Sequence, residues 1–167
     1  TKYATKRTGI ICFENAFHGR TQMAMSLTSK VKPYKLNFGP FVPEVYRMPY
    51  AYCYRCPFKL KYPSCDTACA DFLEDFFIGN VAPENTAAVI AEPIQGEGGF
   101  VTPPAEYFPK LKKICEKYDI PLIIDEIQAG SGRTGKFFAI EHWGIEPDVI
   151  TLAKSFAGGM PLSAVIG

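Results

Sequence analysis

The most constraining feature of the sequence is a pair of short runs of branched apolar residues, each followed by a charged side chain. The run Pro-Leu-Ile-Ile at 121–124 is followed by Asp125 and Glu126, and the run at 148–153 is followed by Lys154. Runs of this kind predict strands buried on both faces, as in a parallel sheet covered by helices. Ligands of such sheets bind beyond the carboxyl ends of the strands, so an acid and an amine are expected at one crevice.

Further apolar runs fit the same sheet. The run at 87–91 ends at Glu92, which brings another carboxylate to the predicted crevice. The run at 9–13 is expected to be the first strand, and residues 162–166 a final one. Residues 130–135 are too rich in glycine for a helix and predict a loop at the mouth of the crevice.

Helices are expected between these strands. Residues 66–78 carry apolar side chains at helical spacing, with Asp66 predicted as the N-cap. A shorter helix is expected to begin at Arg20 and Thr21, and another to open at 102–106 with proline in its first turn. The apolar stripe of this last helix is Leu111, Ile114, Cys115 and Tyr118, and its solvated face is Lys110, Lys112, Lys113 and Lys117. The alternation predicts an α/β fold, a three-layer, doubly wound and mostly parallel sheet.

Composition narrows the class of protein. The 167 residues, 47% of them apolar, suit one domain with a substantial core. A net charge of +1 gives no electrostatic reason to expect nucleic acid or an anionic membrane as a partner. No apolar run approaches the length of a membrane span and the first residues do not resemble a signal peptide, so a cytoplasmic protein is expected. The chain lacks a starting Met and stops inside an apolar run, which favours a fragment.

An irregular, cysteine-rich segment is expected at about residues 32–69. Proline, tyrosine and phenylalanine are frequent from 32 to 63 without a clear period. The segment contains Cys53, Cys56, Cys65 and Cys69. Such spacings suit zinc or an iron–sulfur cluster, while reduced thiols packed in an aromatic-rich loop, or one or two disulfides, are the alternatives. Free thiols are the preferred interpretation, so no metal is assigned and the four cysteines stand only as candidates.

Several motifs, in the same order along the chain, resemble those of the class III aminotransferases. These motifs are Phe17-His18-Gly19-Arg20-Thr21, Asp125-Glu126-Ile127-Gln128, Gly132-Arg133-Thr134-Gly135-Lys136 and Thr151-Leu152-Ala153-Lys154-Ser155 followed by Gly158-Gly159. The resemblance implies a pyridoxal 5′-phosphate enzyme of fold type I, with this chain forming part of the large cofactor-binding domain. It places an N-terminal part, with the phosphate-binding loop, and a C-terminal domain outside the sequence. The iron–sulfur cysteines of some animal members precede the Phe17 motif and do not correspond to Cys53 and Cys56.

The resemblance also implies roles for individual residues. Lys154 would be the catalytic residue that bonds the cofactor aldehyde, because an amine with a lowered pKa is nucleophilic at neutral pH. Asp125 would keep the pyridine nitrogen protonated. Gln128 would bind the ring hydroxyl, and Ile127 and Phe17 would pack on opposite ring faces. The remaining assignments are His18 beside the cofactor, with a structural role as the alternative, Glu92 next to the substrate, and Glu97 as a gate that pairs with an arginine outside the sequence.

The implied activity is transfer of an amino group from an ω-amino acid such as 4-aminobutyrate to 2-oxoglutarate by a ping-pong mechanism. A homodimer, or a dimer of dimers, is expected, and the fragment alone is expected to be inactive. Alternatives within the family are an amino-acid racemase or epimerase, an acetylornithine or ornithine aminotransferase, and a dialkylglycine decarboxylase. A non-enzymatic, metal-binding scaffold is the alternative from another class.

Overall fold

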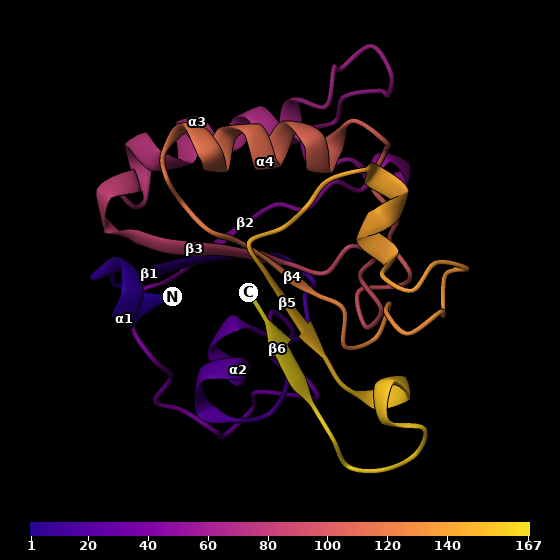
Figure 1. The fold of residues 1–167 in the computed structure, drawn as a ribbon. Helices are drawn as coiled ribbons and strands as arrows, with labels where there is room; N and C mark the ends of the chain where they lie inside the picture. The colour runs from indigo at the N-terminus through magenta and orange to yellow at the C-terminus, as the bar shows by residue number, and fades with distance from the viewer.

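A single six-stranded sheet forms the centre of the computed structural model, which describes residues 1–167 (Figure 1). The strands are β1 (Gly9–Phe13), β2 (Val45–Met48), β3 (Thr86–Ala91), β4 (Leu122–Asp125), β5 (Val149–Leu152) and β6 (Ala164–Ile166). Their order is β2-β1-β3-β4-β5-β6. All neighbouring pairs are parallel except β5 and β6, which are antiparallel. The predicted mostly parallel sheet is confirmed.

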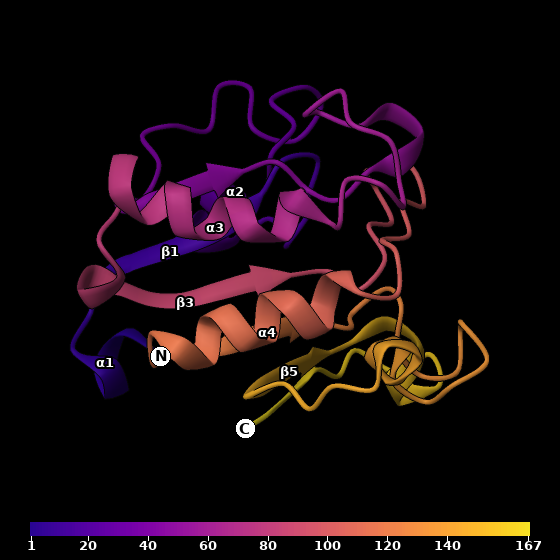
Figure 2. The same ribbon diagram turned by 90° about the horizontal axis from the view of Figure 1, so that it is seen from above.

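Helices cover both faces of this sheet. The α-helices are α1 (Lys2–Thr5), α2 (Gln22–Leu27), α3 (Ala68–Gly79) and α4 (Tyr107–Lys117), and the 3-10 helices are η1 (Cys53–Arg55), η2 (Pro83–Asn85), η3 (Ala139–Trp143) and η4 (Lys154–Ala157). Helices α3 and α4 lie side by side on one face and α2 lies on the other, which gives three layers (Figures 1 and 2). Strands β1 and β3 are buried at every position because both of their faces are covered. No helix is both long and apolar enough to cross a bilayer.

A row of aromatic side chains runs through the core between the sheet and the two longer helices. Its members are Phe13, Tyr50, Tyr107, Phe108 and Trp143. Successive rings meet edge to face, with centroids 5.2 to 5.5 Å apart. Each such contact contributes about 0.5–1.5 kcal/mol beyond the burial of its area. The Tyr50 hydroxyl donates a hydrogen bond of 2.7 Å to the carbonyl of Glu92, so the row also fixes the chain just beyond β3.

Strand β2 lies within the segment that the sequence predicted to be irregular, so that prediction was wrong for residues 45–48. The strand pairs in parallel with β1 at the edge of the sheet. Its pattern is weak because it is short, lies close to Pro43 and Pro49, and is interrupted by Arg47. The Arg47 guanidinium donates to the carbonyl of Ser26 at 2.8 Å, which explains a partly buried arginine there.

Helix α3 begins two residues later than predicted, and Asp66 is not its N-cap. Thr67 occupies that position, without a capping hydrogen bond from its side chain. Asp66 has a φ of 45° and Thr67 a φ of 50°, so the chain makes a left-handed turn before the helix. The Asp66 carboxylate instead lies 3.4 Å from Lys110 Nζ on α4. The predicted end of the helix at Gly79 and Asn80 is confirmed.

Helix α4 turns the predicted apolar stripe toward the core. Leu111, Ile114 and Cys115 are buried, and Tyr118 caps the helix while packing against the same core. The prediction of a uniformly solvated lysine face was wrong for Lys112, whose side chain is only 15% exposed because it pairs with Asp148. The prediction of proline at 103 and 104 in the first turn was also wrong, since the helix starts at Tyr107.

Candidate active site

The carboxyl ends of the parallel strands β1, β3, β4 and β5 open onto one small cavity. Its volume is about 50 Å³, and it is lined by Phe17, His18, Gly19, Glu92, Asp125, Ile127, Gln128 and Lys154. All six residues that the sequence assigned to the cofactor line this cavity, together with Glu92. They come from four separate segments, so the topology of the sheet brings them together.

Asp125 is the last residue of β4 and its carboxylate is buried among donors. One oxygen, Oδ2, lies 2.7 Å from Nδ1 of His18, which is buried as well. The other oxygen accepts hydrogen bonds from the backbone N–H of Ile127 and from the Thr151 hydroxyl, both at 3.1 Å. A carboxylate only accepts hydrogen bonds, so the two donors on Oδ1 and the close contact with His18 fix its position.

Thr151 is a member of the site that sequence reasoning did not assign. Strands β4 and β5 are in a register that places Asp125 opposite Thr151. The hydroxyl of Thr151 therefore meets the Asp125 carboxylate across the sheet. The sequence does show a residue with a hydroxyl group, Thr151, within the apolar run at 149–152. The residue that this hydroxyl contacts depends on the register of the two strands, which the sequence does not reveal.

Lys154 begins the 3-10 helix η4, two residues beyond the end of β5. Its side chain is exposed, and Nζ donates a hydrogen bond of 2.7 Å to Oε1 of Gln128. Lys154 has a φ of 52°, a left-handed conformation that is uncommon for a residue with a Cβ. Such a conformation costs about 1–3 kcal/mol and is found preferentially at functional sites. With this conformation Lys154 lines the cavity.

Gln128 depends on a glycine opposite it. A Cβ added to Gly96, in the turn that follows β3, would lie 2.4 Å from Nε2 of Gln128. A larger residue at position 96 would therefore force the Gln128 amide to shift from its present place against this turn. The sequence offered a weak signal here, since Gly96, Gly98 and Gly99 follow a strand end closely.

Glu92 and Glu126 are buried carboxylates with different surroundings. Glu92 accepts hydrogen bonds from the backbone N–H groups of Phe17 at 2.9 Å and Gly96 at 3.0 Å. Burial raises the pKa of Glu92, although these donors and His18 oppose the shift. Burial likewise raises the pKa of Glu126, whose Oε1 accepts from the N–H of Ile140 at 2.8 Å while Oε2 has no partner. Glu126 fastens the following loop, and Glu92 faces the cavity.

The outer part of the site contains aromatic and acidic side chains. Phe17 is half-buried and packs against Tyr34, with ring centroids 4.7 Å apart. The hydroxyl of Tyr34 donates to the carboxylate of Glu97, which lies on the exposed turn after Gln95 and not among the residues that line the cavity. His18 completes the inner wall, and its buried Nε2 has no hydrogen-bond partner.

An amine, a buried carboxylate and an apolar wall at the carboxyl edge of an α/β sheet are the features of an enzyme site that binds a cofactor covalently. The family model of class III aminotransferases matches residues 1–167, and the chain belongs to this family. It is 51% identical over 163 residues to the probable 4-aminobutyrate aminotransferase of Bacillus subtilis (strain 168). It is 43% identical over 163 residues to the leucine/methionine racemase of Thermococcus litoralis. Each alignment covers 98% of this chain and 37% of the relative.

Solved structures agree with this family. An amine transaminase from an uncultivated Pseudomonas species in a PLP-bound form superposes with a TM-score of 0.89 at 31% identity, covering 98% of this chain and 37% of that one. An (S)-enantioselective omega-transaminase from Thermomicrobium roseum superposes with a TM-score of 0.90 at 34% identity, covering 98% and 38%. The predicted fold type I architecture is confirmed. The chain spans little more than a third of the length of these proteins.

Proposed function

We propose that the complete protein is a pyridoxal 5′-phosphate-dependent aminotransferase that takes the amino group of an ω-amino acid such as 4-aminobutyrate. The acceptor is 2-oxoglutarate, and the two substrates react in turn by a ping-pong mechanism. The observation that carries this proposal is the convergence of Lys154 and the buried Asp125 on one cavity from neighbouring strands. The similarity to 4-aminobutyrate aminotransferases of Bacillus subtilis and Escherichia coli supports the choice of donor.

The residues that line the cavity fit this cofactor. Asp125 is a buried acceptor with its donors already in place, which suits a protonated ring nitrogen. Phe17 and Ile127 offer apolar surface for the two faces of a flat ring, and the Gln128 amide is a donor for its hydroxyl oxygen. The buried Nε2 of His18 lacks a partner, which leaves one polar group available to a ligand.

The cofactor supplies, when bound, an aldehyde that bonds amino groups and a protonated ring that draws electrons from them. Lys154 would hold the cofactor through Nζ, and the same amine, when free, would accept the proton that leaves the amino-bearing carbon of the donor and then release it again. The buried Asp125 side chain would accept the N–H of the ring nitrogen and so favour the protonated ring. Gln128 orients Nζ of Lys154 through the 2.7 Å hydrogen bond.

The substrate side of the site is assigned to Glu92 and Glu97. Glu92 faces the cavity, where its carboxylate would lie close to both the cofactor ring and the substrate. Glu97 lies exposed on a nearby turn, where it is accessible to an arginine from elsewhere in the complete protein. In that protein this chain is part of the large cofactor-binding domain, and the assembly is a cytoplasmic homodimer or a dimer of dimers.

Racemisation of an amino acid is the second candidate function, because one relative of this chain is the leucine/methionine racemase of Thermococcus litoralis. Proton removal by Lys154 is common to both reactions, so these residues serve either. A racemase returns the proton to the same substrate carbon and needs no oxo acid. Chiral chromatography of leucine incubated with the protein alone separates the two functions.

Replacement of Lys154 tests the proposal. The variant Lys154→Ala lacks the amine that moves the proton, so transamination of 4-aminobutyrate is expected to fall by at least about 10³-fold. The assay follows glutamate formation from 2-oxoglutarate by the complete protein loaded with pyridoxal phosphate. Lys113→Ala, at an exposed position on α4, is the matched control and is expected to keep full activity. Turnover by Lys154→Ala at the rate of the control would refute the assignment.

A further inference from the structure

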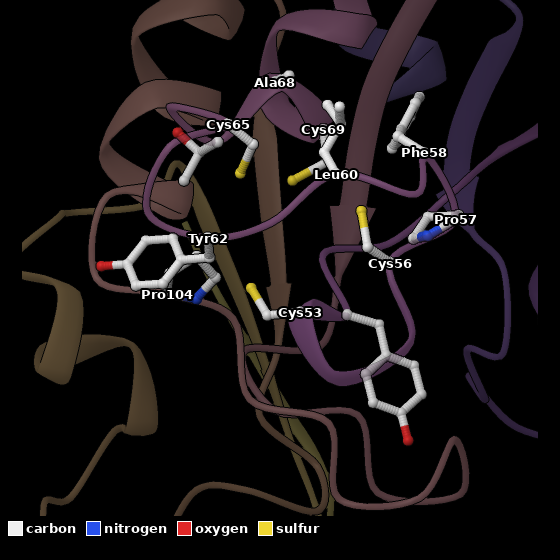
Figure 3. A pocket seen from close by; sticks show the side chains of 12 residues that line it. Cys53, Cys56, Pro57, Phe58, Leu60, Tyr62, Cys65, Ala68, Cys69 and Pro104 are labelled. Carbon is white, nitrogen blue, oxygen red and sulfur yellow. The ribbon is translucent and has the colours of Figure 1, made fainter.

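Four cysteines outside the active site line one pocket. Cys53, Cys56, Cys65 and Cys69 come from two separate stretches of the segment that leads into α3. Figure 3 shows all four sulfur atoms directed toward the same space, with Tyr62 and Pro104 on one side of it. The four thiols are free, and no disulfide joins them. None of these cysteines lies among the residues that line the active-site cavity.

Tight turns hold each pair of cysteines. Cys53 begins η1, where the N–H of Arg55 donates to the carbonyl of Tyr52 at 3.1 Å. Cys56 starts the next turn, and its carbonyl accepts from the N–H of Lys59 at 3.0 Å. Cys65 lies in the turn before α3 and Cys69 in the first turn of that helix. Two residues separate the first pair and three the second, which are spacings of thiolate pairs in structural zinc sites.

The surroundings favour a single enclosed ion. The pocket has a volume of about 20 Å³, enough for one water-sized group. That volume suits a single ion better than an organic ligand. Most of the other lining residues are apolar, namely Tyr52, Pro57, Phe58, Leu60, Tyr62 and Pro104. Four thiols within a mostly apolar lining that contains no carboxylate or imidazole suit a structural site more than a catalytic one.

The two remaining cysteines show what an ordinary buried thiol looks like in this protein. Cys12 in β1 and Cys115 in α4 are fully buried in the core, far from one another in the fold. Burial is the main cause that raises the pKa of Cys12 to about 11 and that of Cys115 to about 12. Neither of them lies among the residues that line the pocket shared by the four clustered cysteines.

We propose that Cys53, Cys56, Cys65 and Cys69 bind one zinc ion, which fastens the segment at 53–56 to the start of α3. Four S–H bonds lose their protons to solvent and four Zn–S bonds of about 2.3 Å form, with no change in oxidation state. No three of these thiols stand in an arrangement that would hold a metal ion in this structure, so binding requires the sulfur atoms to approach one another. The site would carry a net charge of about −2, and three basic residues, Arg55, Lys59 and Lys61, occur on the same segment.

The zinc content of the complete protein, purified without added metal, tests this proposal. About one zinc ion per chain is expected, retained on gel filtration with a weak chelator. The variant Cys56→Ser/Cys65→Ser removes one ligand from each pair and is expected to lose the ion. Cys12→Ala removes a thiol outside the cluster and is expected to keep it. Added ZnCl₂ should raise the Tm of the reduced, metal-free wild type but not that of the double variant.

A second measurement does not depend on how well the double variant folds. Cobalt(II) chloride added to the reduced wild-type protein should produce intense thiolate-to-metal absorption that ZnCl₂ then abolishes. The proposal is overturned if no zinc is present and no such absorption appears, or if the double variant retains the ion. It is equally overturned if the mass of the unreduced protein shows the four thiols joined as disulfides. None of these assays needs pyridoxal phosphate, so their outcome is independent of the proposed aminotransferase activity.

Discussion

Asp125 is the residue at which the separate parts of the site meet. It belongs to β4, and its carboxylate contacts His18 from the segment after β1 and Thr151 from β5. The buried pair of His18 and Asp125 has side chains only 2% and 5% exposed. Replacing either residue with an apolar one would leave the other as a buried polar group without its partner, which typically costs about 1–3 kcal/mol of stability. The site is therefore also a connection between strands.

Replacement of Gly96 tests how closely the turn after β3 must approach Gln128, which follows β4. In Gly96→Ala the new methyl group would lie 2.4 Å from Gln128 Nε2, so the amide must move away from Lys154. We expect kcat for transamination to fall about 10- to 100-fold, since a small displacement of positioning groups has effects of this size. The unfolding temperature should change little. Gly79→Ala, whose Cβ would meet no atom within 4 Å, is the matched control. Equal kcat values in the two variants would contradict the positioning role of Gln128.

Helix α4 is joined to the sheet by a polar contact as well as by its apolar stripe. Asp148, just before β5, accepts 2.8 Å hydrogen bonds from Lys112 Nζ on α4 and from the N–H of Leu122 in β4. Burial opposes ionisation of Asp148, but these donors outweigh it and hold the pKa of the carboxyl below its usual value of 3.8. One side chain thereby connects a helix with two strands.

This contact predicts a pH dependence of stability. The pKa of Asp148 is lower in the folded protein than in the unfolded chain. Its contribution to the free energy of unfolding is therefore fully present at a pH above the pKa of the unfolded chain, and it is lost as the pH falls through the pKa of the folded protein. The side chain is 43% exposed, so solvent screening limits the contribution to about 1 kcal/mol. The Tm of Asp148→Asn should lie below that of the wild type at about pH 6 and approach it at about pH 2–3. A difference in Tm that stayed constant over this range would contradict the prediction, and the exposed Asp75→Asn is the control.

The apolar stripe of α4 should contribute more to stability than its lysines. Leu111 is fully buried, so Leu111→Ala would leave a cavity and is expected to cost about 2–5 kcal/mol. Lys113→Ala, two residues further on the exposed side, is expected to change stability by less than about 0.5 kcal/mol. Urea unfolding of the complete protein, followed by far-UV circular dichroism, measures both. Similar midpoints for the two variants would show that α4 does not form part of the core.

At the scale of the whole molecule, the sequence revealed the strands that are buried on both faces and the charged residues at their ends. These features are local: an apolar run followed by Asp125, or by Lys154 two residues after β5, is visible without knowledge of the fold. Strand β2 was missed because Arg47 and the nearby prolines obscure its pattern. The contacts of Thr151 and Gly96 could not be predicted, since they depend on strand register and on the approach of two turns.

The central claim is that Lys154 and Asp125 belong to an aminotransferase site. Its most direct test mixes the complete protein, loaded with pyridoxal phosphate, with 4-aminobutyrate in the absence of any oxo acid. A ping-pong transaminase should form about one equivalent of succinic semialdehyde per subunit, stop, and resume with glutamate formation when 2-oxoglutarate is added. Absence of the aldehyde, with loss of chirality in an amino acid incubated without an oxo acid, would contradict the account and favour a racemase.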